Sequence, residues 1–408
     1  MPEQAPWRFQ KLIRPMFEYP TGNHILLGRV LTAVGDEVIE DGFVEIEGAK
    51  IKAVGKRADL GSRAEGAVST GGTILPGLFQ SHGHLAWDGI HDLANQSMND
   101  PPEISAYKSA GNMLINLRSG VTTFRDLGMN KANLVAKQAV AQGLFPGPRL
   151  LVCGEGIVQT GGHTYWCCRE ASGADEMRRA VREQVRGGAD LIKIMACHDT
   201  LEFTDEELHA VIDEAHRNRL PITAHATFDA AINRVVRFGI DVIEHGGSMS
   251  EETIGLLVEK KVPIVTTFAP LVMQSQPDIA RKFNIPEWKI AERQKAIADP
   301  KRYAGLVAAA KAGVPIAFGT DCGSPAVGHE VIAPEMAFMI KVGVVADAYA
   351  AIRSATAVAA KLNKMDEKLG TLEPGKLADV IVVDGNPLAD IADIGKVRAT
   401  FLEGKRMV

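Results

Sequence analysis

The sequence has few cysteines and no large excess of charge of either sign. Its 408 residues include 5 cysteines, an odd number that does not suggest a disulfide framework. The 45 lysines and arginines and the 50 aspartates and glutamates give a net charge of −5, which excludes a highly basic nucleic-acid-binding protein. A hydrophobic fraction of 46% excludes a disordered chain.

Long apolar segments are also missing. No run reaches the roughly 18 apolar residues expected of a membrane span, and residues 1–20 lack the apolar core of a signal peptide. We therefore expect a soluble, cytoplasmic protein that acts on a small molecule and binds neither nucleic acid nor membrane.

Short apolar runs alternate with amphipathic stretches from about residue 75 to residue 363. Eight runs predict buried strands, at residues 73–79, 121–127, 149–154, 190–196, 221–226, 242–245, 262–268 and 314–320. Thr204 and Glu207 form a capping-box pattern that opens one of the intervening helices. Eight strand–helix repeats predict an α/β protein with a (β/α)₈ TIM barrel. An open doubly wound sheet is the alternative, although the Gly-rich loop typical of it is missing.

Both flanks of this region have the shorter period of antiparallel strands, over residues 26–68 and 370–408. We expect the two chain ends to form one small β-sandwich domain beside the barrel. The predicted organisation is a first sandwich part at 1–72, the barrel at 73–363 and a second sandwich part at 364–408. Residues 270–300 are too long for a simple loop and are a candidate lid or substrate-binding insertion.

Five potential metal ligands follow or end the predicted strands. His82 and His84 are two residues apart, so in a strand they point to the same side and can chelate one cation. His225, His245 and Asp321 end the fifth, sixth and eighth predicted strands. The carboxyl ends of barrel strands meet at one rim, where active sites lie. The set therefore predicts a metal site, in preference to unrelated polar residues at strand ends.

Lys193 lies inside the fourth predicted strand, flanked by Ile192 and Ile194, where uncompensated burial of its charge is costly. It could be a buried lysine paired with a carboxylate, a Schiff-base nucleophile with a lowered pKa, or a carbamylated lysine that bridges two cations. Four neutral imidazoles and one carboxylate need a further anion if two divalent cations share the site. This charge balance favours a CO2-derived carbamate on Lys193.

Together these motifs resemble the amidohydrolase superfamily. The matching pieces are residues 75–84 (LPGLFQSHGH), Lys193, His225, residues 243–246 (IEHG), residues 319–321 (GTD) and the tail segments 370–379 and 383–388. The Gly-Gly-His segment ending at His163 is similar to the branch that includes Xaa-Pro and Xaa-Arg/Lys dipeptidases and ochratoxin-type amidases. The resemblance implies a metal-dependent hydrolase on a (β/α)₈ barrel with a β-sandwich from the chain ends, and homo-oligomers, which are common in the family.

The resemblance also implies two divalent cations, which we expect to be zinc. The implied assignments are His82, His84 and Asp321 for the more buried cation, His225 and His245 for the outer cation, and carbamylated Lys193 as the bridge. Such cations lower the pKa of a bridging water and polarise the scissile carbonyl.

The implied proton carrier is Asp321, acting as general base and then as general acid. His163 is the candidate donor to the developing oxyanion, although it could also be a loop histidine without contacts. The expected substrate-contacting residues are Trp87, His163, Tyr165, Trp166 and His198.

Three positions depart from the family pattern. Gln80 stands where the family usually has aspartate, which is expected to alter ligand orientation and metal affinity. Residues 164–168 (TYWCC) follow His163 where glycine is frequent, and Thr227 replaces a common aromatic residue. The last two changes weaken assignment to a dipeptidase and suggest a more aromatic pocket and a substrate without a free α-carboxylate.

The predicted activity is hydrolysis of a carbon–nitrogen bond by a metal-bridging hydroxide. Candidate substrates are a linear amide, a carbamate or an N-acyl amino acid, including dipeptides. Hydrolytic deamination of a ring is the first alternative, against which Lys193 argues because mononuclear deaminases need no bridge. Opening of a cyclic amide or lactone is another enzymatic alternative. A catalytically silent barrel scaffold is the alternative outside the enzymes, although unused ligands have no structural reason to converge.

Overall fold

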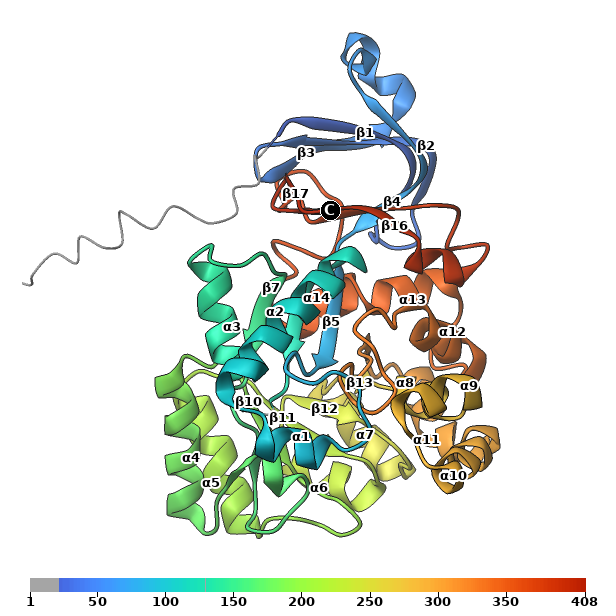
Figure 1. The fold of residues 1–408 in the computed structure, drawn as a ribbon. Helices are drawn as coiled ribbons and strands as arrows, with labels where there is room; N and C mark the ends of the chain where they lie inside the picture. The colour runs from blue at the N-terminus through green and yellow to red at the C-terminus, as the bar shows by residue number, and fades with distance from the viewer. Residues whose placement is uncertain (1–21, 129) are drawn as a thin grey trace, which may run out of the picture.

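The protein has an α/β fold in which a mixed sheet lies beside a set of parallel strands surrounded by helices (Figure 1). The computed structural model describes residues 22–128 and 130–408, so the prediction made for residues 1–20 lies outside the described residues. Within the described ranges, no helix combines the length and the apolar character needed to cross a bilayer.

The mixed sheet is built from both ends of the chain. Its seven strands run in the order β17-β16-β15-β4-β1-β2-β3. The first four in sequence are β1 (His24–Leu31), β2 (Val38–Glu47), β3 (Lys50–Lys56) and β4 (Val68–Pro76). The last three are β15 (Val380–Val383), β16 (Val397–Leu402) and β17 (Lys405–Arg406). The β1–β4 pair is parallel, so the expectation of antiparallel strands throughout is wrong for this pair.

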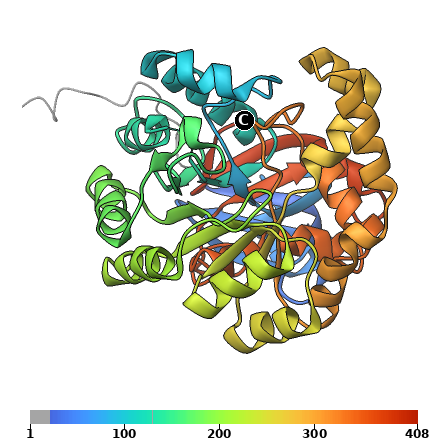
Figure 2. The same cartoon turned by 90° about the horizontal axis from the view of Figure 1, so that it is seen from below.

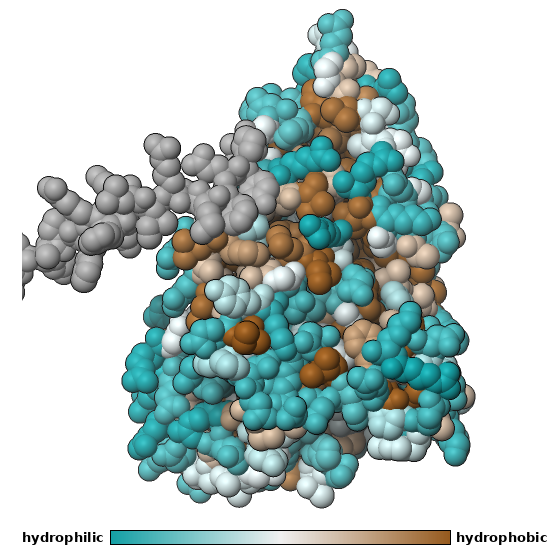
Figure 3. All heavy atoms as spheres, in the orientation of Figure 1, coloured by the Kyte–Doolittle hydropathy of each residue, from teal (hydrophilic) through white to brown (hydrophobic). Residues whose placement is uncertain are grey.

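The mixed sheet curls around its own apolar core. A bridge between Lys50 and Leu377 joins β3 to the segment that leads into β15. Val30, Ile46 and Phe401 are buried in the core between them. On the face shown in Figure 3, hydrophobic side chains are more frequent over this sheet than over the helices below it.

The parallel strands carry the remainder of the fold. They are β5 (Leu78–Gly83), β6 (Val121–Asp126), β7 (Arg149–Val152), β8 (Ile157–Val158), β9 (Arg169–Glu170), β10 (Ile192–Met195), β11 (Ile222–Ala226), β12 (Val242–His245), β13 (Ile264–Thr266) and β14 (Ile316–Phe318). They pair as β5-β6-β7 and as β14-β13-β12-β11-β10-β8-β9. The Asp190 amide donates to the Val152 carbonyl at 2.8 Å, and Gly83 bridges to Cys322. These contacts link β7 to the segment before β10 and β5 to the loop after β14.

Helices surround these strands, as seen in Figure 2. They are α1 (Leu93–Asn99), α2 (Pro102–Arg118), α3 (Ala132–Ala141), α4 (Ala174–Gly187), α5 (Asp205–Arg217), α6 (Asp229–Phe238), α7 (Glu251–Lys260), α11 (Lys301–Lys311), α12 (Ala333–Val342), α13 (Ala348–Ser354) and α14 (Ala357–Leu362). At the start of α5 the Thr204 hydroxyl accepts from the Glu207 amide, and the Glu207 carboxylate accepts from the Thr204 amide. The predicted capping box is therefore confirmed.

The predicted first strand, residues 73–79, is wrong in its bounds. Residues 73–76 belong to β4 of the mixed sheet, and the parallel strand β5 begins at Leu78. The chain changes sheet at Gly77, where an added Cβ would lie 2.2 Å from the Thr122 hydroxyl oxygen. β4 consequently runs across the predicted boundary between residues 72 and 73.

Residues 270–300, the candidate lid or substrate-binding insertion, form short helices. They include most of α8 (Ala269–Gln274), α9 (Pro277–Ala280) and α10 (Glu287–Ala298). The Gln274 side chain donates to the Pro325 carbonyl at 2.9 Å and accepts from Arg293 at 3.1 Å. The insertion is therefore packed against the loop that follows β14.

Candidate metal centre

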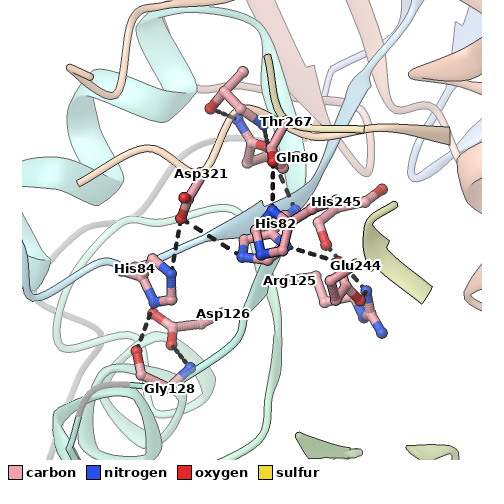
Figure 4. A network of polar contacts seen from close by, with 12 residues as sticks. Gln80, His82, His84, Arg125, Asp126, Gly128, Glu244, His245, Thr267 and Asp321 are labelled. Atoms are coloured by element: carbon pink, nitrogen blue, oxygen red, sulfur yellow. Dashed lines mark hydrogen bonds and ion pairs between the residues drawn. The ribbon is translucent and has the colours of Figure 1, made fainter. Parts of the chain in front are cut away.

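A cavity of about 180 Å³ lies at the carboxyl ends of the parallel strands. Side chains from β5, β10, β11 and β12 and from the loops after β5 and β14 reach it. All six predicted metal-ligand residues line this cavity: His82, His84, Lys193, His225, His245 and Asp321. Parallel strands bring residues far apart in sequence to one edge, and Figure 4 shows four of these side chains around that edge.

Two of the histidines are oriented by acceptors behind them. His82 Nδ1 lies 2.7 Å from Glu244 Oε2, and His84 Nδ1 lies 2.8 Å from the Gly128 carbonyl oxygen. An ionised carboxylate and a carbonyl can only accept, so each ring donates from Nδ1. Nε2 of each ring is left facing Asp321, as a metal ligand requires (Figure 4).

Asp321 is the carboxylate of the cluster. Its Oδ1 lies 3.0 Å from His84 Nε2 and 3.5 Å from His82 Nε2. Burial raises the pKa of Asp321, but its contact with His84 and the nearby imidazoles have the larger effect and lower the pKa to about 2. One ligand atom each of His82, His245 and Asp321 lie within 4.8 Å of one another. This nitrogen and oxygen donor set fits a divalent cation such as zinc.

His225 and His245 form a second pair of rings beside the first. Their ring centroids are 4.6 Å apart, and His245 lies 4.7 Å from the His82 ring. Burial, together with the neighbouring imidazoles, holds the pKa of both residues well below the usual histidine value. Both rings are therefore neutral near pH 7, which is the form that binds metals.

The backbone is strained where two of the ligand candidates sit. His245 has φ 71° and Asp321 has φ 57°, both in the left-handed region that residues with a Cβ rarely occupy. The Asp321 amide donates to the His82 carbonyl at 2.8 Å, and His245 Nδ1 lies 2.6 Å from the Thr267 hydroxyl. Such strain is characteristic of functional positions that the surrounding structure holds in place.

Lys193 is buried on β10, with 1% of its surface exposed. Across residues 22–128 and 130–408 its amine makes no hydrogen bond or ion pair. Burial lowers the pKa of Lys193, and the carboxylates of Glu244 and Asp321 oppose this only from a distance. A direct lysine–carboxylate pair, the first of the three interpretations from the sequence, is therefore not formed.

Glu244 and Arg125 are buried residues of the site to which the sequence analysis assigned no role. Arg125 Nη1 donates to Glu244 Oε1 at 2.7 Å, and Glu244 also accepts from Thr223 and His82. Both charged side chains are almost fully buried. The reasoning applied to Lys193, a charged residue inside an apolar strand, could have found Arg125 as well.

Gln80 contacts Thr320 instead of a ligand side chain. Its amide nitrogen donates to the Thr320 hydroxyl at 2.7 Å, and its carbonyl oxygen accepts from the Thr320 amide at 2.9 Å. A carboxylate could not donate to that hydroxyl unless it were protonated. Gln80 therefore ties β5 to the residue just before Asp321.

The predicted substrate-contacting residues divide into two groups. Trp87, His163 and Trp166 line the cavity, whereas Tyr165 and His198 are outside its lining. Tyr165 is 51% exposed, and the side chain of His198 is 61% exposed, with its ring stacked on His163 at 4.7 Å. For Tyr165 and His198 the predicted contact is therefore not supported. No residue of the 270–300 insertion is among the described lining residues.

Comparison with known proteins agrees with this site. A profile of the amidohydrolase family matches residues 73–407. Ochratoxinase from Aspergillus niger is 29% identical over 412 residues, which cover 90% of this chain and 82% of that protein.

Solved structures give the same grouping. A Xaa-Pro dipeptidase with methionine bound in its active site superposes with a TM-score of 0.80 at 27% identity, covering 94% of this chain and 99% of that chain. A prolidase complexed with N-methylphosphonate-L-proline superposes with a TM-score of 0.81 at 28% identity, covering 95% and 99%. The chain is thus similar to the ochratoxinase and to a Xaa-Pro dipeptidase, and it belongs to the amidohydrolase family as a hydrolase that acts on carbon–nitrogen bonds.

Proposed function

We propose that the chain is a binuclear metal-dependent amidohydrolase on a (β/α)₈ barrel with a small β-sandwich. Its candidate substrates are small amides, carbamates, N-acyl amino acids and dipeptides. The observation that carries this proposal is the convergence of four histidines, one aspartate and an unpaired buried lysine on one cavity. An ordinary charged lysine is not expected at this buried position, because burial of an unpaired ammonium is costly.

The residues fit two divalent cations, which we propose to be zinc, if Lys193 carries a carbamate. The proposed assignments are His82, His84 and Asp321 for one cation, His225 and His245 for the other, and Lys193 between them. When bound, the cations would lower the pKa of a water molecule and polarise the scissile carbonyl.

The chain's own side chains supply the proton transfers. Asp321 is ionised, so it can accept a proton from the attacking water and return it to the leaving amine. His163 lines the cavity, and burial together with the nearby His198 lowers its pKa to about 4. It is thus a neutral imidazole at pH 7, able to donate one N–H to the carbonyl oxygen.

The first test is the metal content of protein purified without chelator, for the native chain and for Lys193→Ala. Two bound divalent ions per chain, about one in the variant, and loss of amide hydrolysis in the variant are expected. Zinc uptake by the stripped native protein should also increase with bicarbonate, because the carbamate forms from CO2. Lys341→Ala is the matched control, since that lysine is outside the cavity lining.

Other metal contents would contradict the proposal. One ion per chain, unaffected by Lys193→Ala, would exclude the carbamate bridge and favour the deaminase alternative. No metal, even after zinc and bicarbonate are added, would favour a silent scaffold.

A further inference from the structure

Apart from its metal-ligand candidates and the polar residues His163, Thr164 and Ser324, the lining of the cavity is largely apolar. Six residues form what we call the apolar wall: Trp87, Leu93, Leu127, Trp166, Cys167 and Met195. They come from the loops after β5, β6 and β8, the start of α1 and the end of β10. Three of them, Trp87, Leu93 and Cys167, belong to one buried cluster against which Trp166 packs.

The wall is held in place by hydrogen bonds outside the cavity lining. Trp87 donates its indole N–H to the Ser97 hydroxyl at 3.0 Å. The Trp87 carbonyl accepts from the Asn112 side chain at 3.0 Å, and His329 Nε2 lies 3.1 Å from the same oxygen. The Trp87 and Trp166 rings lie 5.8 Å apart at 36°. The polar atoms of Trp87 are therefore engaged elsewhere, and its indole ring is left to contact a ligand.

Apart from Lys193, the described part of the lining offers no lysine or arginine side chain for a substrate carboxylate. Its one lysine, Lys193, is the residue that the proposed function assigns to the carbamate. Arg125 is buried outside this lining, bound to Glu244 and to the Ser81 carbonyl. Thr227, which replaces the aromatic residue common in the family, is also outside the lining. Its hydroxyl lies 3.6 Å from Cys197 Sγ.

A carboxylate that leaves water without meeting a cation keeps its full desolvation cost, whereas an apolar group gains from burial. We propose that this site selects amides and carbamates that are uncharged and apolar on both sides of the scissile bond. Among the candidate substrates of the proposed function, it would reject N-acyl amino acids and dipeptides, because their α-carboxylate meets no lysine or arginine side chain in the lining other than Lys193. The reaction itself rests on the proposed function, but the selectivity rests on the composition of the lining.

A matched pair of substrates tests this selectivity. N-acetyl-2-phenylethylamine and N-acetylphenylalanine differ only in the α-carboxylate. For the zinc-loaded protein we expect kcat/KM for the uncharged amide to be higher by at least about 100-fold. Equal values, or a preference for N-acetylphenylalanine, would overturn the inference.

A charge placed on the wall gives a second test. In Trp166→Arg the new guanidinium can pair with the carboxylate, so the ratio of the two kcat/KM values should fall by about tenfold or more. Trp166→Leu keeps the wall apolar and should retain the preference for the uncharged amide. Trp288→Arg is the control, because Trp288 lies on α10, is 68% exposed and is outside the lining. An unchanged ratio in a folded Trp166→Arg protein would contradict the inference.

Binding measured without turnover separates this inference from the proposed function. Quenching of tryptophan fluorescence reports binding of both compounds to the metal-loaded protein, and Trp166→Phe should reduce the signal. Tighter binding of the uncharged amide without hydrolysis would contradict the proposed function and support the selectivity. Hydrolysis of both compounds at similar rates would support the proposed function and contradict the selectivity. If neither compound binds, the selectivity is overturned.

Discussion

Glu244 shows what a single buried charge requires of its neighbours. It lies on β12 with no exposed surface, and it meets Arg125 on one side and His82 on the other (Figure 4). Burial raises the pKa of Glu244, but Arg125 and His82 lower it more, to well below the usual value. The carboxylate is therefore charged, and it orients one metal-ligand candidate while it neutralises the arginine.

We expect Glu244→Gln to lower the free energy of unfolding by about 3–5 kcal/mol, because Arg125 stays buried without its counter-charge. Urea unfolding of the metal-free protein measures this effect. Glu40→Gln is the control, since Glu40 is 72% exposed in its pair with Arg29 and should change stability by less than about 1 kcal/mol. Equal effects of the two substitutions would show that the buried pair does not stabilise the fold.

At the residue scale, the sequence predicted which metal-ligand candidates meet in the cavity but not what holds them. Strand ends and residue spacing indicated His82 and His245, because both follow from the direction of a strand. The contacts of Glu244 depend on pairing between different strands, which spacing within one strand does not report. Tyr165 and Trp166 are neighbours in a short 3₁₀ turn, so one ring faces the cavity while the other is exposed.

At the scale of elements, the apolar pattern located the parallel strands better than it located their ends. Residues 242–245 were predicted as a strand and form β12. The nearly continuous apolarity of residues 73–79 predicts one strand. β4 pairs with β15 and β5 pairs with β6, and at Gly77 between them a side chain would meet Thr122; these contacts are tertiary.

Helix α8 begins at a buried carboxylic acid. Glu335, on α12, accepts a hydrogen bond from the Ala269 amide, the first residue of α8. Burial raises the pKa of Glu335 to about 8, from an ordinary value of 4.5. Between these pH values the folded protein keeps the proton and the unfolded chain releases it. The contribution of Glu335 to stability is therefore complete below pH 4.5 and is lost as the pH rises towards 8.

Glu335→Gln should remove this loss, because an amide does not ionise. When the pH is raised from 5 to 8, we expect the native chain to lose about 3 kcal/mol of its free energy of unfolding relative to the variant. Denaturant unfolding of both proteins at the two pH values gives the difference. Glu330→Gln, at an exposed residue nearby, should show no such difference. A constant difference between Glu335→Gln and the native chain would mean that Glu335 is already ionised at pH 5.

At the scale of the whole molecule, an arginine joins the two parts of the fold. Arg149 on β7 pairs with Asp379, just before β15, at 2.8 Å and with Glu403 at 2.7 Å. Asp379 is buried. The sequence predicted that the chain ends form one β-structure, but the parallel β1–β4 pair and this ion-pair link depend on contacts that periodicity does not report.

Arg149→Met should lower the free energy of unfolding by about 3 kcal/mol, because the buried Asp379 loses its partner. Chemical unfolding followed by circular dichroism measures the change. Arg281→Met removes an exposed pair with Glu287 and should change stability by less than about 1 kcal/mol. If both variants unfold like the native chain, the Arg149 link carries no stability.

The place of β15 in the mixed sheet has a consequence for how the chain is made. Pro76 at the end of β4 pairs with Val380, so the ribosome must add about 300 residues before β4 meets this neighbour. During that time one edge of β4 has open amide and carbonyl groups that another strand could bind. The nascent protein therefore passes through a long stage in which its first sheet is incomplete. A chaperone that shields such an edge would be needed most before the final strands emerge.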